Sequence, residues 1–253
     1  MADVPSLLAR LAPTQPVDFA AFGPIEVQPL TKVQRLTGAF LGRNWVTVPH
    51  VTHHDDVDAT ALEARRREYN ARCAPEAKLT LLPLLLKALV DSLRAFPQLN
   101  ASLSEDGQSL VLKRYWHIGC AIEVPAGLVV AVVRDVDAKP LPALAAEIAA
   151  LSEKARTRGL SLAEMSGSSF CVSSLGHIGG TAFTPIINAP DVAILGVTRL
   201  REQPARRDDG GIEWRTMLPL SLSYDHRVIN GSDAARFVRH VGESLANPAL
   251  FNF

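Results

Sequence analysis

The stretch Leu220–Phe237, LSLSYDHRVINGSDAARF, contains two patterns from which the fold of this chain can be worked out. Its first part alternates apolar residues with serine up to Tyr224, which is the period of a strand with one apolar face. Apolar residues at helical spacing follow and predict an amphipathic helix over residues 232–246. Between the strand and the helix lies the polar turn DHRVING, residues 225–231, so charged groups are expected at the end of a buried strand.

The rest of the chain also mixes strand and helix patterns. β-Branched runs bounded by turn residues predict strands, and apolar periodicity with capping residues predicts helices. Because these elements do not alternate regularly as βαβ units, we expect an α/β sandwich with a mixed sheet rather than a doubly wound fold or a barrel. The expected strands cover residues 45–57, 108–114, 116–124, 127–135, 168–175, 191–200 and 213–224; the expected helices cover residues 31–43, 58 or 60 to 73, 80–96, 140–158 and 232–246.

Residues 1–29 carry five prolines and little periodicity, which predicts an extended arm that gains order by packing on something else. We therefore expect an arm over residues 1–29 and one domain over residues 30–253. The acidic residue at position 3 argues against a signal peptide. The most apolar stretch, Leu79–Val90, is too short to span a bilayer and is expected to be a buried helix.

The composition is that of an ordinary globular protein, with 47% apolar and 21% charged residues. The 26 basic residues balance the 26 acidic ones, so no net field would attract nucleic acid or an anionic membrane. Cys73, Cys120 and Cys171 lie far apart in the sequence and predict neither a disulfide framework nor a zinc knuckle. We therefore expect a cytoplasmic protein with neither nucleic acid nor membrane as a partner.

Three weaker candidate sites can be set beside the polar turn. The run HVTHHDD, residues 50–56, brings only His50 and His54 to one face of a strand, so a partial ligand set converges and no metal is expected. The glycine-rich run 173–181 lacks the lysine and the spacing of a phosphate loop. A Ser-His-Asp hydrolase is not favoured, because no G-x-S-x-G elbow is present and Asp225 would point away from His226.

His226 is the strongest candidate for catalysis. It lies at a strand-to-turn junction, where a rigid element can present a side chain to a cleft. Asn230 adds a second polar group four residues later, and Gly231 permits unusual backbone angles. A lone histidine beside an apolar strand is usually structural, so the surrounding polar cluster carries this interpretation.

The motif DHRVING resembles the D-H-R-x-x-[D/N]-G signature of the 2-oxo acid dehydrogenase acyltransferases, in their catalytic domain. The resemblance extends in order through VPHVT, KLTLLPLLLKAL, HIGCAIEVPAGLVVAVVRD, FCVSSLGHIGGTAFTPIINAPDVAILGV and MLPLSLSYDHRVING. It runs from about Val17 to the C-terminus and implies a two-layer sandwich like that of chloramphenicol acetyltransferase. It further implies trimers, often stacked into a larger core, as components of complexes of the pyruvate dehydrogenase type.

The same resemblance implies roles for individual residues. His226 would be the general base, Ser173 a hydroxyl supplied by the neighbouring subunit, and Asn230 a residue at a position often held by aspartate. Lys32 or Arg35 would be the basic residue that holds this position. The active site would be a channel between subunits, which coenzyme A enters from one end and a lipoyl arm, carried by another domain or chain, from the other. The implied reaction moves an acetyl or other short acyl group between dihydrolipoamide and coenzyme A.

Acid–base chemistry agrees with those roles. Acyl transfer between thiols needs a base that removes a thiol proton, and an imidazole of ordinary pKa about 6.5 can do so. The tetrahedral intermediate carries an oxyanion, which a hydroxyl such as that of Ser173 can stabilise. No metal and no covalent protein nucleophile is needed for this reaction.

Two departures keep alternatives open. Asn230 lacks the charge of the more common aspartate, and Ala126 and Ala131 stand where relatives often have aspartate and proline. Lipoyl and subunit-binding modules are not found in residues 1–29. One alternative is an assembly scaffold with weakened turnover, and another is a free-standing acetyltransferase that acts on a small molecule.

Overall fold

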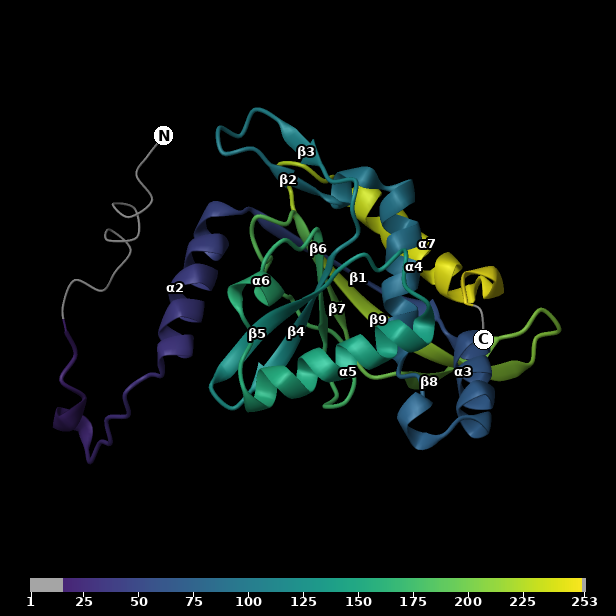
Figure 1. Ribbon diagram of the computed structural model, residues 1–253, viewed down its shortest axis with the longest axis horizontal. Helices are drawn as coiled ribbons and strands as arrows, with labels where there is room; N and C mark the ends of the chain where they lie inside the picture. Colours follow the sequence, from purple (N-terminus) through teal and green to yellow (C-terminus); the bar gives the residue numbers. More distant parts are fainter. Residues whose placement is uncertain (1–15, 252–253) are drawn as a thin grey trace.

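The computed structural model describes residues 16–251. A mixed sheet forms one layer of the domain, and helices packed against it form the other (Figure 1). Seven strands lie in this sheet in the order β1-β9-β7-β6-β4-β5, with β8 paired to β9, and β2 and β3 form a separate hairpin. The strands are β1 His50–Asp58, β2 Ala101–Leu103, β3 Leu110–Leu112, β4 Ile118–Val124, β5 Gly127–Val133, β6 Phe170–Ser174, β7 Ala193–Val197, β8 Arg201–Arg206 and β9 Ile212–Asp225.

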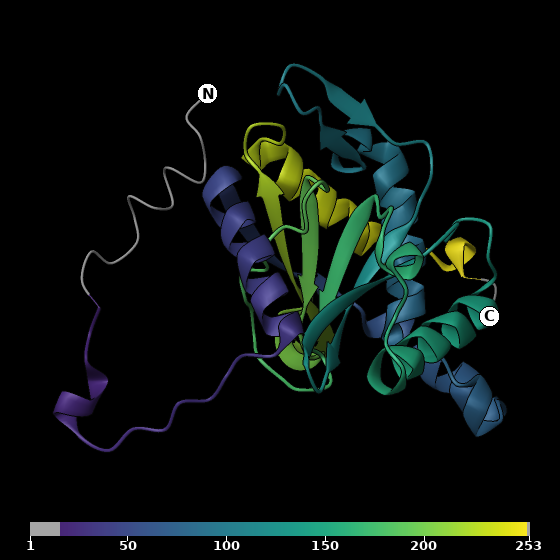
Figure 2. The same ribbon diagram turned by 60° about the vertical axis from the view of Figure 1, so that its left-hand side comes forward.

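The helices are α2 Lys32–Thr47, α3 Thr60–Arg72, α4 Leu81–Ala95, α5 Leu141–Thr157, α6 Leu162–Met165 and α7 Gly231–Ala246. Short 3₁₀ turns cover Phe19–Phe22, Pro75–Ala77, Pro97–Leu99 and Pro248–Leu250. Helices α4, α5 and α7 cover one face of the sheet, whereas α2 lies on the other side (Figure 2). The predicted mixed-sheet α/β sandwich is therefore confirmed.

Strand β9 lies at the centre of the hydrogen-bonding pattern. Along one edge it pairs antiparallel with all nine residues of β1, from His50 opposite Asp225 to Asp58 opposite Met217. Along its other edge it pairs with β7 and then with β8. Its leucines and Tyr224 are buried on the helix-covered face, and serines 221 and 223 are buried on the opposite face. The alternation seen in the sequence therefore separates the two faces as expected.

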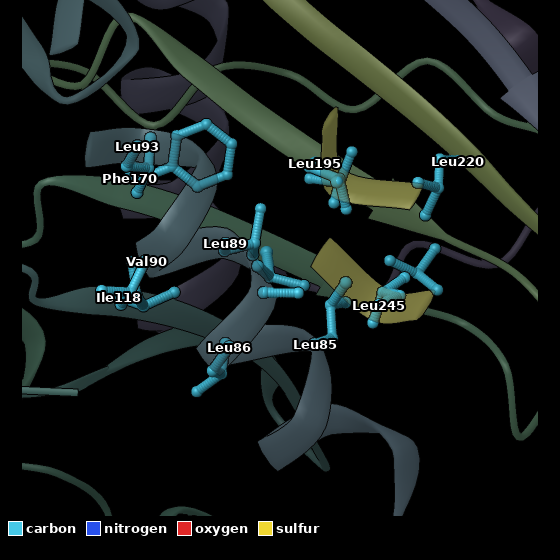
Figure 3. Packing of buried hydrophobic residues seen from close by; sticks show 14 of the residues in the cluster. Leu85, Leu86, Leu89, Val90, Leu93, Ile118, Phe170, Leu195, Leu220 and Leu245 are labelled. Atoms are coloured by element: carbon cyan, nitrogen blue, oxygen red, sulfur yellow. The ribbon is translucent and has the colours of Figure 1, made fainter. Parts of the chain in front are cut away.

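The main core lies between the sheet and helices α4 and α7. Helix α4 is the most apolar helix within residues 16–251, as its sequence predicts, and nine of its residues are buried. Leu85 and Leu89 pack with Phe170, Leu195 and Leu220 from the sheet, and Leu245 comes from α7 (Figure 3). Phe96 and Phe237 meet edge to face at 5.9 Å between ring centroids. The apolar faces of two helices and one sheet are thus covered together.

The opposite face of the sheet is covered less completely. Phe183, in the loop after β6, lies against Gly196 of β7, where an added Cβ would come within 2.7 Å of its ring. The side-chain amide of the buried Asn44 on α2 donates to the carbonyl of Ile187 at 3.0 Å. This loop and the C-terminal half of α2 together form a small second core with Val48, Cys171 and Ile194.

Some elements were not predicted from the sequence. β8 is an edge strand that contains Pro204, which a strand tolerates where its missing N–H faces away from the ladder. β2 is only three residues long, and α2 continues to Thr47, so the strand expected from residue 45 begins at His50. Residues 16–30 lie away from the body of the domain, and residues 1–15 of the expected arm lie outside the described residues (Figure 1).

Replacing Leu89 with alanine tests the importance of the core beneath α4. Leu89 is fully buried, so Leu89→Ala should lower the free energy of unfolding by about 2–5 kcal/mol through lost contacts and a residual cavity. Denaturant unfolding followed by circular dichroism measures this change. Leu162→Ala is the matched control, because Leu162 is 82% exposed and its truncation should cost less than about 0.5 kcal/mol. Equal effects of the two changes would contradict this assignment of the core.

Candidate active site

His226 is the first residue after β9, and the backbone fixes its position. Its N–H donates to the carbonyl of Pro49 at 3.1 Å, which ties the turn to the start of β1. The side chain is exposed, with its ring centroid 5.8 Å from that of Tyr224. The sheet therefore holds the backbone of His226 in place and leaves its imidazole accessible.

Asp225 and Arg227 stabilise the turn that carries His226. The Asp225 carboxylate is 4% exposed and accepts from the backbone N–H of Arg227 at 3.0 Å and from its guanidinium Nη2 at 2.6 Å. The hydrogen bond to Asp225 raises the pKa of Arg227. The Asp225 carbonyl also accepts from the N–H groups of Val228 and Ile229. Asp225 thus holds the junction between β9 and the turn.

Asn230 is the N-cap residue of α7 and is exposed. Its backbone carbonyl accepts from the N–H groups of Asp233 and Ala234, and its side chain forms no capping hydrogen bond. An asparagine at this position usually caps the helix with its side chain. Here the amide remains available for another contact on the same turn as His226.

Ser173 and Ser174 end strand β6 and point to opposite faces of the sheet. Ser173 lies in register with Gly196 of β7, which in turn lies opposite Ser221 of β9, so Ser173 is on the face away from the helices. Ser174 is on the helix-covered face and lines a cavity beneath α5. The two serines of the SSLG motif therefore cannot serve the same site.

Within one chain, Ser173 and His226 lie at opposite ends of the sheet. Ser173 is level with Ser221, and His226 follows Ser221 by five residues along β9. At about 3.3 Å per residue, this separates them by about 17 Å along the strand direction alone. One chain therefore does not assemble a Ser173–His226 pair, and it forms no Ser-His-Asp triad because Asp225 is engaged with Arg227.

Lys32 and Arg35 do not lie near Asn230 in the same chain. They belong to the first turn of α2, and the hydroxyl of the preceding Thr31 donates to the carbonyl of Ala126, at the β4–β5 turn. This turn lies at the Ser174 end of the sheet, because β4 runs parallel to β6. The structure therefore does not support an intrachain pair between either base and Asn230.

His50 and Asn44 both bind the backbone of Ile187, a contact that was not predicted from the sequence. His50 Nδ1 lies 2.7 Å from the carbonyl of Val48, and its Nε2 accepts from the N–H of Ile187 at 3.0 Å. The side-chain amide of Asn44 donates to the carbonyl of Ile187. His50 therefore fixes the loop after β6 close to the His226 turn. Ile187 follows His50 by 137 residues, so no local signal in the sequence could have revealed this contact.

His50 and His54 lie on one face of β1, as predicted, but each is used separately. His54 Nδ1 lies 2.8 Å from the hydroxyl of Ser221, whereas His50 contacts the loop after β6. Within residues 16–251, no three histidine, cysteine, aspartate or glutamate side chains gather in the arrangement of a metal site. In the same part of the chain, no helix has the length and apolar character needed to cross a bilayer.

The glycine-rich loop after Ser174 is held by Arg199. The guanidinium donates to the carbonyls of Gly176, His177 and Ile178, at 3.1–3.5 Å. The N–H of Leu175 continues the ladder by donating to Val197. An added Cβ on Gly176 would lie 3.3 Å from the carbonyl oxygen of Thr198. Gly176 therefore permits close backbone packing in this loop.

The three cysteines differ in accessibility and all carry free thiols. Burial, and to a smaller extent Glu147, raises the pKa of Cys120 to about 12. Burial followed by the Asp191 carboxylate raises the pKa of Cys171 well above its ordinary value. Both thiols are therefore protonated at pH 8 and shielded from solvent.

Thiol labelling tests this description. At pH 8, iodoacetamide should modify Cys73 of the native protein and leave Cys120 and Cys171 intact, because only thiolates that reagent can reach react. Peptide mass spectrometry after a short reaction measures this selectivity, and denatured protein is the control in which all three should react. Rapid labelling of Cys120 in the native protein would contradict the burial and the raised pKa of its thiol.

The chain matches the family model of the 2-oxoacid dehydrogenases acyltransferase, catalytic domain, over residues 22–252. It is 50% identical over 240 residues to the dihydrolipoyllysine-residue acetyltransferase component of the pyruvate dehydrogenase complex of Pseudomonas aeruginosa, which covers 94% of this chain and 44% of that protein. The counterpart from Azotobacter vinelandii is 52% identical over 91% of this chain and 36% of that protein. The chain thus spans less than half the length of these relatives.

Solved structures agree with the family match. The cubic core of a pyruvate dehydrogenase multienzyme complex superposes with a TM-score of 0.90 at 52% identity, over 94% of this chain and 99% of that chain. A chloramphenicol acetyltransferase, at 14% identity, gives a TM-score of 0.55 over 81% of this chain and 94% of its own. This second likeness concerns the fold alone and confirms the predicted fold class.

A further structure comes from an investigation of the catalytic mechanism of the Azotobacter vinelandii dihydrolipoamide acetyltransferase. It has a TM-score of 0.90 at 50% identity and covers 94% of this chain and 99% of that chain. The investigation concerns the roles of a serine, a histidine and an asparagine. The asparagine follows the histidine by four residues, and the serine precedes the histidine by 52 residues.

Proposed function

Because this chain belongs to the 2-oxoacid dehydrogenase acyltransferase family, as its catalytic domain, we propose that it transfers an acetyl group between dihydrolipoamide and coenzyme A. The observation that carries the proposal is the turn after β9, where an accessible His226 and Asn230 have the spacing of the histidine and asparagine in the Azotobacter vinelandii enzyme. The chain's relatives are components of pyruvate dehydrogenase complexes. We therefore propose the same kind of complex as its setting.

In this proposal His226 is the general base. A thiol of ordinary pKa about 8.5 must lose its proton to attack a thioester, and an imidazole of ordinary pKa about 6.5 can accept that proton near neutral pH. The new carbon–sulfur bond forms as the thiolate attacks, and the other thiol leaves when the tetrahedral intermediate collapses. His226 returns the proton to that leaving thiolate, so the same residue serves both directions.

Ser173 is the proposed donor to the oxyanion of the intermediate. Counting 52 residues back from His226 reaches Ser174, the residue next to Ser173. The orientation of the side chains favours Ser173, because its hydroxyl is on the face of the sheet that is not covered by helices α4, α5 and α7. A second chain could reach this face.

Asn230 is the proposed partner of His226 on the same turn. The amide of Asn230, in place of the more common aspartate, is one of the two departures that left open a scaffold with weakened turnover. That reason no longer favours a scaffold, because an asparagine at the same spacing is one of the residues investigated in the mechanism of the Azotobacter vinelandii enzyme. Its side chain makes no cap with α7, which leaves the amide free to orient a reacting group.

We further propose that each site forms between two chains of a trimer. The separation of about 17 Å along the strands of one chain supports this, because a histidine and a serine so far apart cannot act on the same atoms. The exposed arm supports it as well, since Val17, Phe19, Phe22 and Val27 are each more than half exposed. Apolar side chains spread along an arm are typical of a segment that packs on another subunit.

The substrates and setting follow from the same proposal. Coenzyme A is a substrate, and the lipoyl group would be presented by another domain or chain. The protein would assemble as a homotrimer or a larger trimer-based core, with other subunits of the complex as partners. A cytoplasmic location is also proposed, in line with three free thiols and no disulfide.

Replacing His226 tests the base. His226→Ala should lower kcat for acetyl transfer from acetyl-CoA to dihydrolipoamide by about 10²- to 10⁴-fold. Because the side chain is exposed, the unfolding midpoint and the particle size should stay unchanged. Steady-state kinetics and light scattering measure the two effects. Full activity in this variant would exclude His226 as the base.

Mixing two inactive variants tests whether sites form between chains. In a trimer with shared sites, His226→Ala subunits supply intact Ser173, and Ser173→Ala subunits supply intact His226. Refolding the two together at equal amounts should restore about one quarter of the sites, whereas each variant alone stays inactive. Ser174→Ala is the matched control for Ser173→Ala and should retain activity, because its hydroxyl faces the cavity beneath α5. No recovery in mixed trimers of confirmed composition would contradict the shared site.

A further inference from the structure

A cavity of about 520 Å³ lies beneath α5 and has no role in the proposed reaction. Its outer wall is formed by Ile148, Ser152 and Arg156, which follow one another at intervals of four residues and so share one face of the helix. Its floor is formed by Cys120 and Ile122 of β4 and Ala131 of β5. Figure 1 shows α5 running across these two strands. The volume is within the range of ligand-binding pockets, about 300–1,000 Å³.

The cavity exists because β4 and β6 diverge. They pair over three residues only, from Ile118 opposite Phe170 to Cys120 opposite Val172. Beyond this point β4 continues with β5 alone, and the core divides into the main cluster and a small cluster of Ile122, Ala131 and Ala155. The small side chains of Cys120 and Ala131 leave the space between the clusters open.

The character of the cavity changes along α5. At the Ile148 end the lining is apolar and includes Leu82 and Val133. At the other end Arg156 is 51% exposed, and its one ion pair within the described residues is a loose contact of 3.7 Å with Glu153. Glu123 is at the same rim, but it alternates to the opposite face of β4 from Ile122 and is exposed. The Ile148 end of the cavity is thus apolar, and the other end carries the weakly paired guanidinium of Arg156.

Polar groups at the rim of the cavity have no protein partners. Within residues 16–251, the side chains of Ser152, Ser174 and His177 form no hydrogen bond to protein, although all three line the cavity. Ser152 precedes Arg156 by one helical turn, so the two side chains are neighbours on the face of α5 that lines the cavity. An anion with an apolar chain needs hydrogen-bond donors for its charged group and an apolar cavity for its chain, and this cavity provides both.

We propose that this cavity binds a linear aliphatic monocarboxylate of about eight to ten carbons, with its carboxylate on Arg156 and Ser152 and its chain toward Ile148 and Cys120. Arg156 follows Ile148 by eight residues, which corresponds to about 12 Å of helix. An extended chain advances about 1.2 Å per bond, so about ten bonds fill that length. Acetate is too short to reach from the cation to the apolar end.

Direct binding of octanoate to the assembled protein, measured by isothermal titration calorimetry, tests the proposal without relying on acetyl transfer. Each buried methylene should strengthen binding by about fourfold, so octanoate, with two more methylenes, should bind about 15-fold more tightly than hexanoate. Arg156→Gln should weaken octanoate by at least about tenfold and leave 1-octanol unchanged. Ala131→Leu should weaken both ligands, because it fills the floor of the cavity.

Arg158→Gln is the matched control, since Arg158 is an exposed arginine that follows α5 and does not line the cavity. It should bind octanoate as the unaltered protein does. The proposal is overturned if octanoate shows no binding, or if Arg156→Gln and Ala131→Leu bind it as tightly as Arg158→Gln does. Loss of acetyl transfer with octanoate binding intact would instead count against the proposed function alone.

Discussion

The pairing of β9 on both of its edges is the constraint on which the rest of the structure depends. Fourteen residues of this strand hold β1 along one edge and β7 and β8 along the other. Because side chains alternate, its leucines can be buried under α4 and α7 only if its serines lie on the opposite face. Slipping the register by one residue would exchange these two sets, so burial of the leucines fixes the position of Asp225 and with it the turn that carries His226.

The same sheet explains why the candidate site is incomplete in one chain. Strand spacing is nearly constant, and the register of β6, β7 and β9 places Ser173 and His226 at opposite ends of the sheet. No change of side-chain rotamer can cross that distance. A shared site between subunits is thus a consequence of sheet geometry, and the exposed apolar residues of the arm suit the same kind of assembly.

Several elements could be predicted because their signals are local. Helix α4 has an apolar run with Pro83 in its first turn, and β4 and β5 are separated by the turn signal at residues 125–127. β8 and β2 could not, because β2 is only three residues long and Pro204 interrupts the strand pattern of β8. The contacts of Asn44 and His50 with Ile187 were missed for a different reason, because these partners are more than 130 residues apart.

By itself, the sequence determined the mixed α/β fold, the family, and the position of His226 and Asn230 on a turn between a buried strand and an amphipathic helix. These depend on patterns within a few residues, namely alternation, helical periodicity and one short motif. Only the tertiary structure decided which way Ser173 and Ser174 face, that Lys32 and Arg35 lie far from Asn230, and that a cavity opens where β4 and β6 diverge. Strand order and register determine these features, because they bring together residues whose separation in the sequence carries no information about contact.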